Sequence, residues 1–163
     1  MTWPELKKII DEVKERFGEA VVEEVYNEPR IAKIIVKVES IEEVARYLSR
    51  IGFDHVKSVT GIDLLKLREG GGNLIEVVYQ LGSYNLEALR DSVLNLSVKL
   101  DRDNPETPSL HEIWPSAEYH EREVYEMLGV KFRKHPNLKP LLLPEYWADI
   151  PPLRKDYKVP GRE

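Results

Sequence analysis

The stretch Ser116–Leu143, SAEYHEREVYEMLGVKFRKHPNLKPLLL, decides how the second half of the chain folds. Its first part predicts a helix, because Ser116 is a favoured N-cap residue and Gly129 tolerates the left-handed conformation that ends many helices. Apolar side chains recur at helical spacing and predict a buried face made of Ala117, His120, Val124, Met127 and Leu128. After Gly129 this period stops, and a basic run and several prolines follow, so we expect no long regular element there.

The charged residues of this predicted helix allow two interpretations. Arg122 is spaced to form i,i+4 pairs with Glu118 and Glu126 on the face opposite the apolar one. Glu121 and Glu123 lie at the two borders of the apolar face, about 160° apart at 3.6 residues per turn, so they cannot act as a carboxylate pair on one substrate. A solvated helix face is the ordinary explanation of such a charge run, and a functional motif is the alternative.

Composition restricts the class of protein. The 163 residues suit one domain with a real core, and the formal net charge of −5 makes nucleic acid an unexpected partner. The chain has no cysteine, so it offers no thiolate ligands for zinc or an iron–sulfur cluster. Its apolar runs are far shorter than the roughly 18–20 residues that a membrane span requires, and we expect neither a span nor a signal peptide.

The segments before Ser116 predict an α+β fold with a mostly antiparallel sheet packed with helices. Periodicity and caps predict helices at residues 3–17 and 41–51, and strands at 20–26, 31–38, 55–67, 74–81 and 91–100. The glycine-rich residues 69–73 predict a hairpin turn that makes the third and fourth strands antiparallel partners. We expect residues 1–129 to form this domain.

The last segment, residues 130–163, is here called the tail. It contains six of the eleven prolines together with many large apolar side chains, which do not belong on a solvated segment. This composition predicts that the tail is an extended, proline-rich segment that leaves the domain and binds a partner. The alternative is that it folds back on its own domain.

A family resemblance is carried by the run Glu121–Gly129, EREVYEMLG, followed by Phe132, His135-Pro136 and Leu138. These residues resemble the signature of the 30-kDa subunit of respiratory complex I, the NADH:quinone oxidoreductase, and of the related subunit of membrane-bound nickel–iron hydrogenases. Further similar segments are SLHEIWP (109–115), TGID (60–63), VVY (77–79), LPEYW (143–147) and PLRKDY (152–157). The resemblance covers about 100 residues and replaces the solvated-face interpretation of EREVYE.

The resemblance implies a structural and assembly subunit rather than a catalyst. Such a subunit lies in the peripheral arm on the cytoplasmic side of the membrane, held through the complex, and clamps a large 49-kDa-type subunit beside other peripheral-arm subunits. It implies no cofactor in this chain, with Fe–S clusters and the quinone or nickel–iron site in partner subunits. The signature and partner-binding residues that it implies are Glu121, Arg122, Glu123, Tyr125, Glu126, Gly129, Phe132, His135, Pro136, Leu138, Trp147, Arg154, Lys155, Asp156 and Tyr157.

Two alternatives stay open at this point. The complex could be a NADH:quinone enzyme, a nickel–iron hydrogenase or another ferredoxin-oxidising complex, and this chain alone does not choose among them. A more remote alternative is a self-contained metal-dependent enzyme that uses His111, Glu112, His120 and Glu121, although these histidines lack the i,i+4 spacing of a zinc helix. His135 is expected to be a structural histidine rather than a proton carrier.

Overall fold

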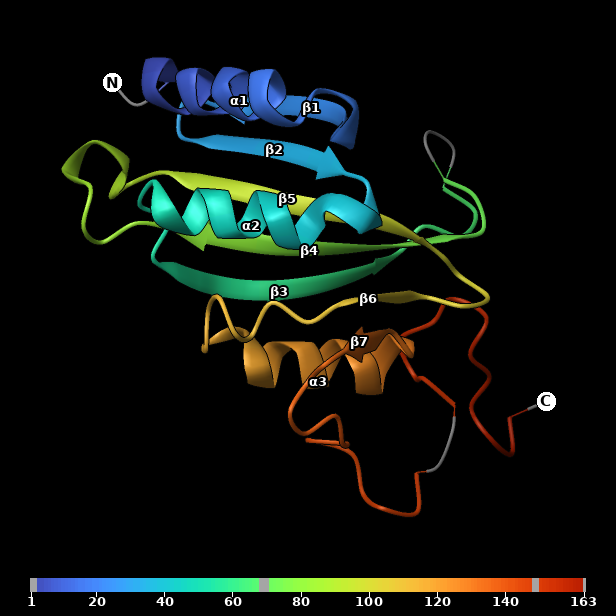
Figure 1. Ribbon diagram of the computed structural model, residues 1–163. Coiled ribbons are helices and arrows are strands. Elements are labelled where there is room, and N and C mark those ends of the chain that lie inside the picture. The colour runs from blue at the N-terminus through green and yellow to red at the C-terminus, as the bar shows by residue number, and fades with distance from the viewer. Residues whose placement is uncertain (1–2, 68–70, 148–149, 163) are drawn as a thin grey trace.

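The computed structural model describes residues 3–67, 71–147 and 150–162. Its main feature is a five-stranded sheet with helices against it (Figure 1). The strands lie in the spatial order β1 (Val21–Glu28), β2 (Ile31–Val36), β5 (Val93–Asp101), β4 (Leu74–Gly82) and β3 (His55–Asp63). Only the β2–β5 pair is parallel within this sheet, so the predicted α+β class with a mostly antiparallel sheet is confirmed.

Three α-helices accompany the sheet in the described residues: α1 (Trp3–Phe17), α2 (Ile41–Arg50) and α3 (Ala117–Leu128). Helices α1 and α2 cover one face of the sheet, and α3 lies beside the edge strand β3 (Figure 1). All three were predicted within one or two residues, because each has an apolar stripe at helical spacing. Short 3₁₀ turns occupy Gly18–Ala20, Val38–Ser40 and Glu87–Leu89.

The core lies between the sheet and these helices. Its strand residues alternate, as β5 illustrates with Leu94, Leu96 and Val98 fully buried on the helix-covered face. Trp114, which precedes α3, is also buried and donates its indole N–H to the carbonyl of Phe53. This bond ties the entry of α3 to the segment between α2 and β3.

The predicted third strand, residues 55–67, is too long. Strand β3 ends at Asp63, because the Asp63 carboxylate accepts the N–H of Leu65 and turns the chain away from the sheet. Lys66 then adopts a positive φ of 62°. The antiparallel pairing of β3 with β4 is confirmed, whereas residues 69 and 70 of the predicted hairpin turn lie outside the described residues.

Two short strands were missed. Strand β6 (Glu106–Pro108) lies after the last predicted strand, residues 91–100, and it pairs in parallel with β7 (Lys131–Arg133). Each is only three residues long, so neither has a period to read, and the pair forms only because the two ends of α3 bring them together. Val130 and Phe132, the first apolar residues of the tail, are consequently part of the core.

The predicted side-chain cap of α3 is wrong. Ser116 makes no capping bond, and its hydroxyl instead donates to the carbonyl of Val56. The predicted end is confirmed, because Gly129 is left-handed with φ 78° and its N–H donates to the carbonyl of Tyr125.

Candidate functional site

The signature stretch and the tail meet along α3, and they form the candidate site. Glu121 is fully buried rather than at the border of an apolar face, which corrects the prediction. Its carboxylate accepts the phenolic O–H of Tyr79 at 2.7 Å, the N–H of Leu110 at 2.8 Å and the hydroxyl of Ser109. One carboxylate thus joins α3 to the central strand β4 and to the segment that leads into α3.

The electrostatics of this buried group are those of a structural network. Burial raises the pKa of Glu121, while its three donors act in the opposite direction. Burial and the neighbouring Glu121 raise the pKa of Tyr79 well above its ordinary value, so this phenol stays protonated and donates. The arrangement favours a fixed set of hydrogen bonds over proton exchange.

Arg122 binds the tail instead of forming the predicted pairs with Glu118 and Glu126. Its Nε donates to the carbonyl of Lys139 and its Nη2 to the carbonyl of Pro140, each at 3.0 Å. The planar fork of a guanidinium suits two adjacent acceptors, and the proline-interrupted backbone leaves these carbonyls free of regular structure.

Glu126 receives the next part of the tail. Its carboxylate accepts three consecutive backbone N–H groups, those of Leu141 at 3.2 Å, Leu142 at 2.9 Å and Leu143 at 2.7 Å. Glu126 is only 8% exposed, so these bonds satisfy a nearly buried charge. Together, Glu126 and the preceding Arg122 hold residues 139–143 against α3.

His135 is placed as a structural histidine. Its Nε2–H donates to the carbonyl of Glu118 at 3.0 Å, and its Nδ1 accepts the N–H of Asn137 at 3.0 Å. Accepting at Nδ1 requires that nitrogen to carry no proton, so this geometry describes a neutral imidazole. Nε2 thus attaches the start of the tail to α3, and Nδ1 fixes the turn of the tail at Asn137.

The C-terminal end of α3 is satisfied by the tail. The N–H of Leu153 donates to the carbonyl of Met127 at 3.0 Å, and Nε of Arg154 donates to the carbonyl of Leu128 at 2.7 Å. A helix leaves its last carbonyls without intrahelical partners, so these contacts supply what the end of α3 lacks. A Cβ at Gly129 would lie 3.0 Å from Pro151 and 3.2 Å from Arg154, closer than ordinary contact, and the positive φ of 78° also favours glycine.

A buried ion pair, unrecognised in the sequence, fixes the last part of the tail. Arg102, at the end of β5, donates to both oxygens of Asp63 at 3.0 Å and to Asp156 at 2.6 Å. The backbone N–H of Lys155 also donates to Asp63, at 2.8 Å. Asp63 stood in the TGID similarity, but Arg102 lies outside every similar segment and every predicted helix or strand, so no signal could have found it.

The tail therefore does not extend away from the domain, and that expectation is wrong. After β7 the described tail residues form no helix or strand (Figure 1). Their polar backbone groups nevertheless bond to side chains and to the end of α3. The prolines that prevent regular structure leave those groups without backbone partners, and α3 provides them. Whether residues 1–129 fold without the tail is not decided by these contacts, so the domain boundary between residues 129 and 130 stays a prediction.

The tail nevertheless leaves large apolar side chains in solvent. Tyr146 is 84% exposed, Leu153 63%, Leu142 62% and Ile150 54%. Trp147, 39% exposed, stacks with Tyr157 at a ring-centroid distance of 6.4 Å. Such a concentration on one irregular segment is typical of an interaction surface.

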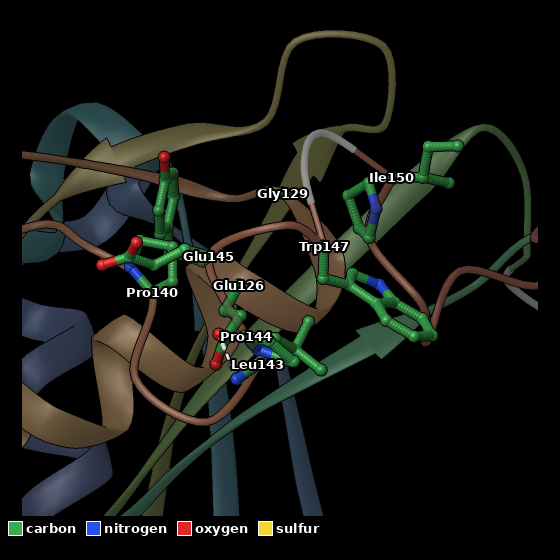
Figure 2. Close-up of a pocket in the computed structure, with 10 residues that line it drawn as sticks. Glu126, Gly129, Pro140, Leu143, Pro144, Glu145, Trp147 and Ile150 are labelled. Carbon is green, nitrogen blue, oxygen red and sulfur yellow. Dashed lines mark hydrogen bonds between the residues drawn. The ribbon is translucent and has the colours of Figure 1, made fainter.

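An open pocket of about 360 Å³ lies between α3 and the tail. Figure 2 shows Glu126 and Leu143 on one side of it and Trp147 and Ile150 on another. Tyr125 lines the same pocket. The remaining signature residues divide between core and surface: Phe132 is buried, Leu138 packs partly against the core, and Glu123 and Pro136 are exposed.

The metal-site alternative finds no support in this geometry. Glu121, one of its four proposed ligands, already accepts three hydrogen bonds. The described residues contain no group of three or more histidine, cysteine, aspartate or glutamate side chains that could hold a metal ion. Within the same residues, no helix is both long enough and apolar enough to cross a bilayer.

Comparisons with known proteins agree with the resemblance. Residues 34–163 match the family described as respiratory-chain NADH dehydrogenase, 30 Kd subunit. The C subunit of the F(420)H(2) dehydrogenase of Methanosarcina mazei is 37% identical over 93% of this chain and 91% of its own length. The C subunit of the NADH-quinone oxidoreductase of Chloroherpeton thalassium is also 37% identical, over 90% of this chain and 58% of its own length.

Solved structures share the fold. The trypsin-resistant fragment (1–134) of Nqo5 superposes with a TM-score of 0.68 at 25% identity, over 82% of this chain and 98% of the fragment. A chain of the membrane-bound sulfane sulfur reductase, an archaeal respiratory membrane complex, superposes with a TM-score of 0.77 at 22% identity, over 95% of this chain and 86% of that chain. At that identity the second likeness concerns the fold alone.

Proposed function

Because the chain belongs to the 30-kDa subunit family of respiratory-chain NADH dehydrogenase, we propose that it is a structural subunit that clamps a large, 49-kDa-type catalytic subunit through its tail. Members of this family are subunits of membrane-bound, complex I-type oxidoreductases. The clamp, the identity of the neighbour and the position on the cytoplasmic side are our proposal.

One observation carries the proposal: the signature residues shape the tail and leave its apolar side chains in solvent. Arg122 and Glu126 use their polar atoms to hold residues 139–143, so they serve the shape of the surface. Tyr146, Ile150 and Leu153 have no comparable burial. Burying one large apolar side chain contributes roughly 1.5–3 kcal/mol of favourable free energy. Covering this surface therefore stabilises a complex with a partner.

We propose that this subunit holds no redox cofactor and performs no turnover by itself. The sequence contains no cysteine, so a cluster bound by thiolates of this chain is ruled out. In this proposal the electrons pass through Fe–S clusters and a quinone or nickel–iron site of partner subunits. A stoichiometric flavin or NADH oxidation by the purified chain would contradict it.

The electron donor and acceptor of the complex stay open. The chain is equally identical to relatives named for F(420)H(2) and for NADH-quinone chemistry, and the hydrogenase-type complex remains the alternative. Sequencing the large subunit that co-purifies with this chain decides between them. Two Cys-x-x-Cys pairs in that subunit mean a nickel–iron hydrogenase, because thiolates are the ligands that such a site needs.

The clamp is tested by removing its exposed aromatic side chains. We expect Tyr146→Ala with Trp147→Ala to abolish co-purification of the large subunit from the native host, because aromatic anchors dominate most interfaces. The melting temperature of the isolated chain should change by only about 1–2 °C, since surface substitutions have small effects on stability.

Val22→Ala is the matched control, because Val22 is 61% exposed on β1, distant from the tail in the chain. Co-purification should be unaffected in this variant. Retention of the large subunit by the double tail variant at the level of the unsubstituted chain would show that the tail is not the interface.

A further inference from the structure

The charge of this protein is divided between its two parts. Residues 130–163 hold eight lysines and arginines against four aspartates and glutamates, a formal charge of +4. Residues 1–129 hold 16 basic and 25 acidic residues, a formal charge of −9. The tail lies at the opposite end of the molecule from α1, so this division is also a separation in space (Figure 1).

Most of the basic side chains of the tail are exposed and unpaired. Arg133 pairs with Glu106, and Arg154 caps the end of α3. Within the described residues, no ion pair involves the exposed side chains of Lys131, Lys134, Lys139, Lys158 and Arg162. Their charges are therefore available to a partner.

The unpaired charges alternate along the chain with the exposed apolar residues. Lys139 precedes Leu141 and Leu142 with one proline between them, and Lys158 stands between Tyr157 and the exposed Val159. The same segment thus offers apolar contact area bordered by cations, which is the common layout of an interface core and its rim.

We infer that the tail docks on an acidic face of the large subunit that has an apolar centre, and that opposite charge speeds their association. This inference rests on the proposed function and adds the chemistry of the partner surface. An acidic surface attracts the basic tail and repels the acidic domain. The subunit therefore approaches such a surface with its tail foremost.

The acidic domain also selects the kind of partner. A membrane surface or a nucleic acid is an extended polyanion, and it repels a protein whose formal net charge is −5. An acidic patch on a protein can match the tail alone. The observations therefore favour a protein surface over an anionic bilayer.

The test measures association of the full chain with the purified large subunit by surface plasmon resonance at 50 and 300 mM KCl. The tail variant carries Lys131→Gln, Lys139→Gln and Lys158→Gln, and a Lys→Arg version of the same three positions keeps the charge. The control variant carries Lys7→Gln, Lys37→Gln and Lys57→Gln, three exposed lysines of the acidic domain.

We expect the tail Gln variant to associate about 5–10-fold more slowly at 50 mM KCl and to lose most of its salt dependence, with little change in the dissociation rate. The tail Arg variant should behave like the unsubstituted chain, and the domain control should not associate more slowly.

Two results would overturn the inference while leaving the proposed function intact. One is binding of the large subunit with equal rates in the tail and control variants. The other is lysine-dependent binding of the chain to phosphatidylglycerol vesicles while the rates with the large subunit stay the same. If the unsubstituted chain binds the large subunit at neither salt concentration, the proposed function itself fails.

Discussion

At the scale of single residues, Arg102 does the most to join distant parts of the chain. It is 5% exposed and contacts Asp63 at the end of β3 and Asp156 in the tail. Breaking one side of a buried ion pair costs more than the pair contributes, because the remaining charge stays out of water. Asp63 is the more buried of its two partners, so its replacement is the sharper test.

Asp63 makes the free energy of unfolding depend on pH in the acidic range. Burial raises its pKa, but hydrogen bonds from Arg102, Lys155 and Leu65 outweigh burial and lower the pKa from 3.8 to about 2. A carboxyl with a depressed folded-state pKa adds stability above its unfolded pKa and loses it as the pH falls. We expect about 2 kcal/mol of unfolding free energy to disappear between pH 4 and pH 2.

The measurement is urea unfolding followed by circular dichroism across that pH range. Asp63→Asn should be less stable at pH 7 by roughly 3 kcal/mol and should lack this share of the acid dependence. Asp91→Asn, which removes only an exposed pair with Arg30, is the control. An unchanged acid profile in Asp63→Asn would contradict the role assigned to this carboxylate.

Glu121 is predicted to act as a unit with Tyr79. Glu121→Gln replaces one carboxylate oxygen by an amide N–H₂, which then faces either the Ser109 hydroxyl or the donors of Tyr79 and Leu110, and it removes the charge that all three donors bind. We therefore expect a loss of about 2–4 kcal/mol of unfolding free energy. Tyr79→Phe should lose about 1–2 kcal/mol, because it removes one buried hydrogen bond. Thermal and urea unfolding of the double variant should show a smaller loss than the sum. Additive losses would mean that the two side chains are not coupled.

At the scale of elements, the packing of α3 on β3 depends on a glycine. A Cβ at Gly61 would overlap the side chain of Leu128 and come within 3.0 Å of Val124. We expect Gly61→Ala to destabilise the fold by about 1–3 kcal/mol, as overpacking does elsewhere. Gly72→Ala is the matched control, because a Cβ there meets no atom of the described residues within 4 Å. Equal melting temperatures of the two variants would show that α3 moves away from β3 at little cost.

The bend of the tail at residues 141–143 is predicted to depend on Glu126. Glu126→Gln keeps the size of the side chain but removes the charge that accepts three backbone N–H groups. We expect hydrogen exchange at Leu141–Leu143 to accelerate by about tenfold or more, since charge-assisted bonds of this kind are worth roughly 1.5–3 kcal/mol. Exchange in β4 should stay unchanged, which distinguishes local opening from global unfolding.

At the scale of the whole molecule, the tail belongs to the fold as well as to the surface. Deleting residues 139–163 removes Asp156 from Arg102 and the Lys155 N–H from Asp63, and it uncovers the end of α3. We expect the truncated chain to melt about 5–10 °C lower, because 1 kcal/mol corresponds to roughly 2–4 °C in a chain of this size. Scanning calorimetry of the truncated and full chains measures this. Equal melting temperatures would show that the tail adds nothing to the stability of the domain, as expected for the free, extended segment that its prolines predicted.

The amino-acid sequence by itself determined the three α-helices, the five long strands and the family, because each depends on a local pattern. Apolar periods fix where α1, α2 and α3 run, and Gly129 marks the end of α3. The signature EREVYEMLG identified the family, and the comparisons confirm it. The roles of the signature residues in binding a partner stay predictions.

Only the tertiary structure decided what the charged residues of that signature contact. Local spacing suggested that Arg122 pairs along its own helix, whereas its partners lie 17 and 18 positions away. Glu121 reaches Tyr79 across 42 positions, and Asp63 meets Lys155 across 92. A period reports which face of a helix is buried, but it carries no information about which distant polar group is buried against it. A charge can leave water only where folding supplies such a partner, and for this reason the tail became part of the domain that it was expected to leave.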